Sequence, residues 1–482
     1  MRDLLGRAGY SRDGIQELLG VSGDVLSRKG DRPVHLRRLP GTGPLDTLVR
    51  LFLLDVSVEV GDAERELGTE ELEALGTLRL VHEGEGGVQG AVRLVPHGAI
   101  LVASDLPDEQ GLHPDHVAGV HRPSVTLADL TVRRRVDRAL DMGTGCGIQA
   151  LLTAQHAGQV VATDVNERAL AFADLNAALN GLDNIETRAG SFFEPVAGET
   201  FELVVSNPPY VISPETAYVF RDSGLGRDRV SERLVDELPG FLEEGAFGTI
   251  MASWIQEGDD PSTRPRGWLE GKGCDAWILH TGVEDPLTAA AAWNRDLEPH
   301  EQRYADAIDR WTGYFHEEGI GALAYGSIVL RRRSGGANWI RSRELPNEPR
   351  ERPREHVERL FTGPDAAERL ATDEAAADAR VELVEGATLE RMLRRGTDGW
   401  LESASLTLAV GIPFSAELDG FTAMFLAQLD GSYPVGEIVA ALAREHDASE
   451  ERLLASGTEI VRELLRDGFA VVTAIDSQTP AS

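Results

Sequence analysis

The sequence predicts an α/β fold built on one central Rossmann-like sheet, and three observations predict it. First, short apolar runs alternate with helical patterns between residues 136 and 333. Second, the first run leads into a glycine-rich loop, GTGCG, at residues 143–147. Third, the fourth run ends abruptly in Asn-Pro-Pro-Tyr at residues 207–210. Short apolar strands separated by helices form parallel sheets that are covered on both faces. This segment contains seven such runs, so we expect seven strands.

Each of the seven expected strands is an apolar run followed by a helical pattern or a turn. In chain order they are RALDM, QVVATD, IETRA, FELVVS, AFGTIMAS, DAWILH and GALAYGSIVLRRR. The helical patterns IQALLTAQ, RALAFADLNAAL and RVSERLVDELPGFL fall between them. The connection before the last strand is long and carries an aromatic helix, EQRYADAIDRWTGYFHEE, which we expect to be an insertion near the mouth of the sheet.

Further modules are expected on both sides of the sheet domain, which spans residues 136–333. Residues 1–135 combine short amphipathic helices with a strand pair, the pattern of an N-terminal winged-helix-like α+β module. Residues 334–355 are rich in Arg, Pro, Gly and Asn and are predicted to be a linker. Residues 356–482 again combine helices with a short strand, which predicts a C-terminal winged-helix-like module.

Composition restricts the class of protein. The formal net charge of −33 disfavours broad, non-specific binding to phosphate backbones, although a local basic patch can still accept RNA or DNA. The two cysteines exclude a disulfide framework and a multi-cysteine zinc site and fit a reducing compartment, so we expect a cytoplasmic protein without a metal. No apolar run reaches ~18 residues and the N-terminus is charged, so neither a membrane span nor a secretory signal is expected.

The glycine loop predicts a nucleoside-binding site. Gly143 and Gly145 let the backbone turn sharply and approach a ligand closely. A dinucleotide fingerprint requires G-x-G-x-x-G, and its third glycine would fall at Ile148, which weakens a dinucleotide interpretation. Asp141 repels a pyrophosphate and suits a cation, while Asp164 ends the second strand, where an acid can bind both ribose hydroxyls. S-adenosylmethionine fits this set, because it joins an adenosine to a sulfonium and an α-amino group.

The Asn-Pro-Pro-Tyr end of the fourth strand predicts an acceptor site for a planar NH2 group. It is expected beside the glycine loop, in the crevice where such sheets bind ligands. The side-chain oxygen of Asn207 and the carbonyl of Pro208 can each accept one N–H, which orients the nitrogen and leaves electron density on it. Tyr210 can stack on a flat substrate group. The alternative is an Asx-type turn in which the prolines only stop the strand.

These residues resemble class I S-adenosylmethionine-dependent methyltransferases of the branch that methylates amide and amino nitrogens. The likeness covers about residues 119–255 and rests on LDMGTGCGIQALL, VVATDVNERALAFADLNAALNGL, SFFEPVAGETFELVVSNPPYV and RDSGLGRDRVSERLV. Within this branch the sequence is most similar to release-factor glutamine methyltransferases and small-subunit rRNA guanine methyltransferases. The resemblance implies a seven-stranded class I methyltransferase sheet with S-adenosylmethionine as the cofactor.

The resemblance also implies roles for individual residues. The catalytic residues that it implies are Asn207, Pro208 and Tyr210. The cofactor-binding residues that it implies are Asp141, Gly143, Gly145, Asp164, Ser191 and Thr126. Thr126 belongs to HRPSVTLADL, which resembles the segment that closes over the cofactor in these enzymes. The family often has an acid after the third strand that recognises the adenine amine; this chain departs from that pattern and reads GSFFEP, so Ser191 or the backbone of Phe192 would take its place.

Three functions remain open at this point. A protein or peptide amide is the favoured methyl acceptor, because the chain is acidic and because LDGFTAMFLAQLDGSYPVGEIVAALAREH is similar to small PqqD-like peptide-binding modules. An exocyclic base amine of RNA or DNA would use the same Asn-Pro-Pro-Tyr chemistry. A binding scaffold that kept the cofactor fold without catalysis is the third possibility, against which the intact Asn207 argues.

Several other side chains admit a structural and a functional interpretation. Solvated loop histidines are favoured over metal ligands at His113, His116 and His121. Trp293, Trp311 and Tyr314 could line a substrate pocket, but the helical spacing of Trp311 and Tyr314 favours packing against the sheet for these two. Cys146 lacks a basic neighbour in sequence and is expected to be structural. A substrate-site border and a plain helix cap are equally plausible for Asp222, Gly224 and Asp228.

Overall fold

The computed structural model describes residues 1–21, 31–106, 113–215, 224–335, 337–345, 353–395, 400–408, 410–412 and 414–475. The chain divides into two compact units. The first contains Met1–Ala128 and Arg134–Ser342, and the second contains Asp129–Arg133 and Arg343–Ser482. Among the helices described, none combines the length and the apolar character that crossing a bilayer requires.

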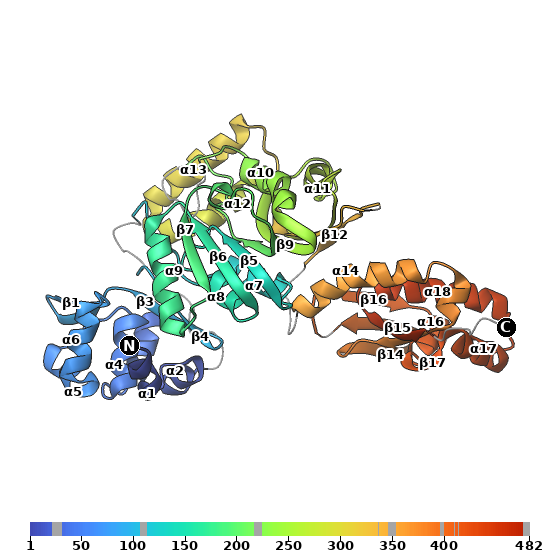
Figure 1. Cartoon of the computed structure of the whole chain (residues 1–482), viewed down its shortest axis with the longest axis horizontal. Helices are drawn as coiled ribbons and strands as arrows, with labels where there is room; N and C mark the ends of the chain where they lie inside the picture. The colour runs from blue at the N-terminus through green and yellow to red at the C-terminus, as the bar shows by residue number, and fades with distance from the viewer. Residues whose placement is uncertain are drawn as a thin grey trace. The chain divides into compact units, whose positions relative to one another are not determined.

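A mixed sheet of eight strands forms the centre of the first unit (Figure 1). In spatial order its strands are β12 (Ile340–Glu344), β10 (Cys274–Glu284), β11 (Leu323–Arg332), β9 (Leu242–Ile255), β8 (Phe201–Ser206), β5 (Val136–Met142), β6 (Ala157–Asp164) and β7 (Ile185–Ala189). The strands from β9 to β7 run parallel, and β11 runs antiparallel to both of its neighbours. The prediction of seven strands is therefore corrected to eight, because β12 is added at the edge. Its sequence IRSRE is partly exposed along its length and has no apolar run to reveal it.

The sheet forms because its central strands are apolar on both faces. All but one of the six residues of β8 are buried, and so are the last ten residues of β9. Such strands gain stability only when helices cover both faces. The strand order reverses at β5, which lies between β6 and β8. In sheets of this kind a crevice opens outside the carboxyl ends of the strands at the point of reversal, and ligands bind there.

Helices connect and cover these strands in the first unit. They are α7 (Arg122–Leu130), α8 (Ile148–Ala154), α9 (Glu167–Asn180), α10 (Arg229–Glu237), α11 (Thr263–Leu269), α12 (Pro286–Trp293) and α13 (Glu301–Glu317), with short 3-10 turns at Glu194–Val196, Leu238–Phe241 and Arg295–Leu297. The α9 helix begins at an Asn166 cap whose side chain accepts from the Arg168 amide, and it ends at Gly181 in the left-handed conformation. These caps fix where α9 starts relative to the end of β6.

The N-terminal part of the first unit packs on α8 and α9 rather than standing alone. Its elements are α1 (Arg2–Ala8), α2 (Arg12–Leu19), α3 (Arg32–Arg38), α4 (Pro44–Phe52), α5 (Val60–Leu67), α6 (Thr69–Thr77) and the hairpins β1 (Val81–Gly84) with β2 (Gly87–Gly90) and β3 (Arg93–His97) with β4 (Ile100–Ser104). One continuous hydrophobic core runs from Leu4 and Leu5 to Leu151 and Phe172. The N-terminal elements and the two sheet helices therefore share their burial.

Two asparagines on α9 join it to the β4 strand. The Asn176 side chain accepts from the Ala103 amide at 2.7 Å and donates to the Ala103 carbonyl at 2.8 Å. One turn further on, Asn180 makes the same pair of bonds with the backbone of Leu101, at 2.9 and 2.7 Å. Asn176 is fully buried and also donates to the Cys146 carbonyl at 2.8 Å. The same amide thus contacts both β4 and the glycine loop.

The second unit has its own core. Its elements are α14 (Pro353–Arg369), α15 (Asp373–Ala377), β13 (Ala379–Leu383), β14 (Ala387–Arg395), β15 (Trp400–Leu408), β16 (Phe414–Leu418), α16 (Gly420–Leu426), β17 (Asp430–Pro434), α17 (Val435–Glu445), α18 (Glu450–Arg466) and β18 (Ala470–Ile475). Two three-stranded sheets are present, in the orders β17-β13-β18 and β14-β15-β16. Val439, Phe425, Val461 and Leu465 are among the residues buried between its helices.

A buried histidine on α14 predicts acid sensitivity of the second unit. His356 is fully buried; its Nδ1 accepts from the Ile412 amide at 3.1 Å, and its Nε2 bonds the Asp467 carbonyl at 2.9 Å. Burial lowers the pKa of His356 to about 4. Because the unfolded chain binds the proton more tightly, the free energy of unfolding is expected to be constant above about pH 6.5 and to fall, by up to ~3 kcal/mol, as the pH drops towards about 4.

Hydrogen exchange of α14 peptides at several pH values, with urea, measures this dependence in the full chain. His356→Gln is expected to lower stability at neutral pH and to flatten the pH dependence. The exposed His446 on the far end of α17 offers the matched control, since His446→Gln should leave the profile unchanged. An equal slope in the wild type and in His356→Gln would show that His356 is not the titrating group.

Candidate functional site

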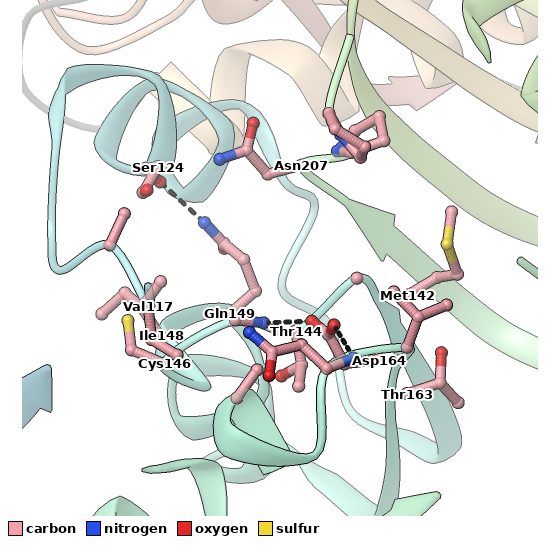
Figure 2. A pocket seen from close by; sticks show the side chains of 18 of the residues that line it. Val117, Ser124, Met142, Thr144, Cys146, Ile148, Gln149, Thr163, Asp164 and Asn207 are labelled. Carbon is pink, nitrogen blue, oxygen red and sulfur yellow. Dashed lines mark hydrogen bonds between the residues drawn. The ribbon is translucent and has the colours of Figure 1, made fainter. Parts of the chain in front are cut away.

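A cavity of about 520 Å³ lies where four successive parallel strands end. Its walls include the loops after β5, β6, β7 and β8, together with residues before β5 and one residue of α12. Figure 2 shows Asn207 at the top of this cavity and Asp164 at the bottom, with Gln149 reaching between them towards Ser124. The cavity is therefore one space that joins the glycine loop to the Asn-Pro-Pro-Tyr loop.

The glycine loop needs glycines for two different reasons. Gly143 and Gly145 have φ angles of 71° and 54°, and a Cβ on either would point into open space. Here the requirement is the left-handed backbone, and the open space is available to a ligand. Gly147 has φ 83°, and a Cβ there would come within 3.1 Å of Ala173 on α9. That third glycine therefore allows close packing of the loop against a helix.

Asp164 ends β6 and holds the glycine loop in place. Its Oδ2 accepts from the Gly145 amide at 2.9 Å, and its Oδ1 accepts from the Asn166 amide at 2.9 Å. Burial raises the pKa of this carboxyl above its ordinary value, and the backbone donors oppose that shift. Each oxygen keeps one further lone pair, so the carboxylate can also accept two hydroxyl groups from the cavity.

Asp141 lies beneath the glycine loop rather than in the cavity wall. Only 1% of the residue is exposed, and its Oδ2 accepts from the Thr144 hydroxyl at 2.6 Å and from the Ala150 amide at 2.9 Å. Burial raises the pKa of Asp141 to about 7, and the nearby charge of Asp164 adds to the rise. Any effect of Asp141 on a ligand is therefore electrostatic, or acts through Thr144, which lines the cavity.

The Asn-Pro-Pro-Tyr loop faces the same cavity, which all four of its residues line. Asn207 is half-buried, whereas Tyr210 is 9% exposed. The Pro208 carbonyl accepts from the Tyr210 amide at 2.8 Å, which closes a tight turn and leaves the oxygen one lone pair. The Ser253 hydroxyl on β9 donates to the Tyr210 carbonyl. The turn and this bond together fix the loop to the neighbouring strand.

The two remaining predicted residues differ in position. Ser191 lines the cavity next to Phe192, just after β7. Thr126 is half-buried on α7 and is not part of the cavity wall, although Pro123 and Ser124 of the same helix are. The structure thus brings seven of the nine predicted site residues to one cavity and leaves Asp141 and Thr126 behind its wall.

Sequence reasoning missed several residues that line the cavity. Gln149 at the start of α8 donates to the Ser124 carbonyl at 2.7 Å, and it reads as an ordinary surface amide in the sequence. His121 lies 2.5 Å from the Ser124 hydroxyl, and with His116 it lines the cavity, although both were expected to be solvated loop residues. Val165, an apolar residue that is 55% exposed, follows Asp164. Its position directly after Asp164 was the signal that the sequence offered.

The other candidates fall into different places. Trp293 lines the cavity, whereas Trp311 is fully buried on α13. Cys146 is buried in the glycine loop, and burial raises its thiol pKa to about 12, so it is a poor nucleophile. Asp222 lies outside the described residues. Among the residues described, no cluster of three or more His, Cys, Asp or Glu side chains could hold a metal ion.

Three stretches of the chain match known families. Residues 123–222, which include the glycine loop and the Asn-Pro-Pro-Tyr loop, match the "Methyltransferase small domain". Within residues 123–222 the chain is therefore similar to that family. Residues 7–91 and 367–472 match two families that are described only as domains of unknown function. Along the chain, the methyltransferase match thus lies between the other two matches.

Curated glutamine methyltransferases are similar to part of this chain. A release factor glutamine methyltransferase of Xylella fastidiosa is 35% identical over 169 residues, which are 34% of this chain and 58% of that protein. A ribosomal protein uL3 glutamine methyltransferase of Bordetella pertussis is 44% identical over 139 residues, 26% of this chain and 46% of its own length. The chain therefore spans about half the length of these curated relatives.

A solved rRNA methylase structure from Streptococcus thermophilus aligns with 45% of this chain and 99% of its own, at 16% identity and a TM-score of 0.26. The order and direction of the strands around the methyltransferase small domain give the fold directly. It is a class I methyltransferase fold with a mixed sheet of eight strands.

Proposed function

We propose that this chain transfers a methyl group from S-adenosylmethionine to a planar amide nitrogen of a protein or peptide. The observation that carries the proposal is the single cavity shared by the glycine loop, Asp164 and Asn207. A cofactor site and an acceptor site must open into one space for direct group transfer. A turn that only ended a strand would not need its polar side chain in that space.

The cavity fits S-adenosylmethionine at each of its chemical parts. Asp164 has lone pairs left for two ribose hydroxyls, and open space adjoins Gly143 and Gly145. The exposed side chain of Val165 gives an apolar surface for a flat base, and the backbone after Gly190, at Ser191 and Phe192, is available to its polar edge. When bound, this cofactor supplies an electrophilic methyl group. Asp141 would add negative charge beneath the sulfonium end.

Asn207 and Pro208 would bind and orient the acceptor. The Asn207 side-chain oxygen and the free lone pair of the Pro208 carbonyl can accept the two N–H groups of an amide. Two fixed acceptors hold the nitrogen in one orientation. This orientation helps methyl transfer to an amide more than to an amine, because the lone pair of an amide nitrogen is delocalised. The Tyr210 ring lies beside them and limits the acceptor to a flat group.

A protein acceptor is favoured over a nucleic acid. The curated relatives of the central segment are glutamine methyltransferases that act on a release factor or on a ribosomal protein, according to their names. The net charge of −33 also opposes a polyanionic substrate. An exocyclic amine of RNA or DNA remains the second candidate, because the same two acceptors fit it. A non-catalytic scaffold would not require Asn207 in the cavity.

Methyl-labelled S-adenosylmethionine added to a cell extract tests this function. We expect the label to enter material that protease removes and nuclease leaves intact. Acid hydrolysis of that material should release the label as methylamine if a side-chain amide carried it. Label in nuclease-sensitive material would overturn the protein acceptor and favour the base amine, and no transfer in any extract fraction would favour the scaffold.

We propose the following roles for the rest of the chain. Residues 1–135 are an N-terminal winged-helix-like module that supports the class I sheet at residues 136–333. Residues 334–355 were expected to be a linker, but they include the edge strand β12 and the first turn of α14. They lead to a C-terminal winged-helix-like module at residues 356–482, which would bind part of the protein substrate. We also propose that the protein acts in the cytoplasm.

The raised pKa of Asp141 predicts a pH-dependent affinity for S-adenosylmethionine. With a pKa of about 7, the carboxyl is mostly neutral at low pH and becomes charged as the pH rises. If the charged form attracts the sulfonium, the affinity should rise up to ~10-fold between about pH 6 and about pH 8. Titration calorimetry across this range measures it. Asp141→Asn keeps an acceptor for the Ala150 amide and should remove the pH dependence; the same dependence in the variant would contradict the electrostatic role.

A further inference from the structure

The connection between β10 and β11 supplies a wall of the cavity. It contains α12 and α13, and Trp293 at the end of α12 lines the cavity. Every other lining residue among those described lies between residues 116 and 211. Among the described residues, this connection is the only part of the chain after the Asn-Pro-Pro-Tyr loop that contributes to the cavity wall. Trp293 is connected to Tyr210 indirectly, through Tyr325 and Ser253.

A chain of contacts ties Trp293 to the acceptor loop. Its indole N–H donates to the Tyr325 hydroxyl at 3.2 Å, and the two ring centroids are 6.2 Å apart. Tyr325 lies on β11 opposite Ser253 of β9. The Ser253 hydroxyl donates to the Tyr210 carbonyl. The position of the indole is therefore set by the same strands that set the position of Tyr210.

The α13 helix contacts residues that follow the Asn-Pro-Pro-Tyr loop in the sequence. Trp311 and Arg310 both donate to the Glu215 carboxylate, at 3.2 and 3.0 Å. The Tyr314 hydroxyl accepts from the Arg227 amide at 3.0 Å. Glu215 and Arg227 follow the Asn-Pro-Pro-Tyr loop in sequence. One helix thus contacts the described residues on both sides of positions 216–223.

We propose that Trp293 is a specificity-determining residue that selects a side-chain amide on an aliphatic stem, as in glutamine, within a protein substrate. Together with Pro209 and Val211, its ring gives the cavity apolar surfaces near the two amide acceptors. Such apolar surfaces suit the methylene groups of an aliphatic stem. This proposal rests on the proposed amide methylation and assigns a residue of this chain to the selection of the acceptor.

The test compares Trp293→Ala and Trp293→Phe with the wild type. Methyl-labelled S-adenosylmethionine first identifies the labelled protein in a cell extract, and that purified protein then serves as the acceptor. Trp293→Ala should raise the acceptor KM ~10-fold or more, because a large apolar contact is lost, and leave kcat within a few-fold. Trp293→Phe should recover most of the affinity. The affinity for S-adenosylmethionine, measured by calorimetry, should stay within about twofold in both variants.

Trp268→Phe provides the control. Trp268 lies on α11, stacks near Arg264 with 5.7 Å between guanidinium and ring, and is not in the cavity wall. It should leave both constants unchanged. If the wild type labels protein but Trp293→Ala has an unchanged acceptor KM, the role of Trp293 is overturned and the proposed function stands. Label in nucleic acid, or none in any fraction, would overturn the proposed function and this proposal with it. Weaker cofactor binding in Trp293→Ala would show a general structural role.

Discussion

Asn207→Ala is expected to lower the rate of methyl transfer by about 100-fold to about 1,000-fold, the scale seen when one positioned hydrogen-bonding group is removed from a reacting centre. The variant removes the side-chain oxygen that would accept one N–H of the amide, so the nitrogen loses its fixed orientation. The loss should appear in kcat. Steady-state transfer of labelled methyl groups to the acceptor protein measures it.

The structure offers a clear control for Asn207→Ala. Asn338 is exposed in the loop before β12 and is absent from the cavity wall, so Asn338→Ala should keep full activity. Binding of S-adenosylmethionine should stay within about twofold of the wild type in Asn207→Ala, because Asn207 and Asp164 lie at opposite ends of the cavity (Figure 2). Full turnover in Asn207→Ala would show that the Asn-Pro-Pro-Tyr loop is only a turn.

Asp164→Ala is expected to weaken the binding of S-adenosylmethionine ~100-fold or more. Charge-assisted hydrogen bonds contribute about 1.5–3 kcal/mol each, and two to the ribose hydroxyls would be lost. The variant also removes the acceptor for the Gly145 and Asn166 amides, so the glycine loop loses its anchor. Titration calorimetry with S-adenosylmethionine alone measures the effect without any acceptor.

Asp183→Ala is the matched control for Asp164→Ala, because Asp183 is an exposed acid shortly after α9 and lies outside the cavity wall. Its affinity should equal that of the wild type. Asp164→Asn keeps one acceptor oxygen and should fall between the two. An affinity in Asp164→Ala equal to that in Asp183→Ala would remove Asp164 from the cofactor site.

Local patterns are sufficient to predict the residues that meet at the strand ends. Gly143, Ser191 and Asn207 lie just after three different strands and Asp164 ends a fourth, and parallel strands bring their carboxyl ends to one edge. The sequence therefore contains their convergence once the strands are recognised. The same reasoning cannot decide which way a side chain at a strand end points. Asp141 has the right residue type and position, yet its carboxylate bonds Ala150 beneath the loop.

Contacts between distant segments account for what the sequence could not show. The sequence offers Trp293 as a possible pocket residue but does not place it. Its place in the cavity depends on how the β10–β11 connection folds back over the strand ends, which no spacing in the sequence encodes. The β12 strand was missed for a related reason, because an edge strand is stabilised by its neighbour's backbone rather than by an apolar pattern of its own.

The paired amides of Asn176 and Asn180 have a consequence for the evolution and engineering of this chain. If the first 105 residues were removed, four hydrogen bonds to the backbone of Leu101 and Ala103 would disappear, and a buried amide that contacts the glycine loop would lose its other partners. Unpaired buried polar groups cost about 1–3 kcal/mol each. The segment that forms the cavity is therefore not independent of the residues that precede it. A substitution that moves the β4 strand or the glycine loop is expected to be tolerated only when the other changes to match it.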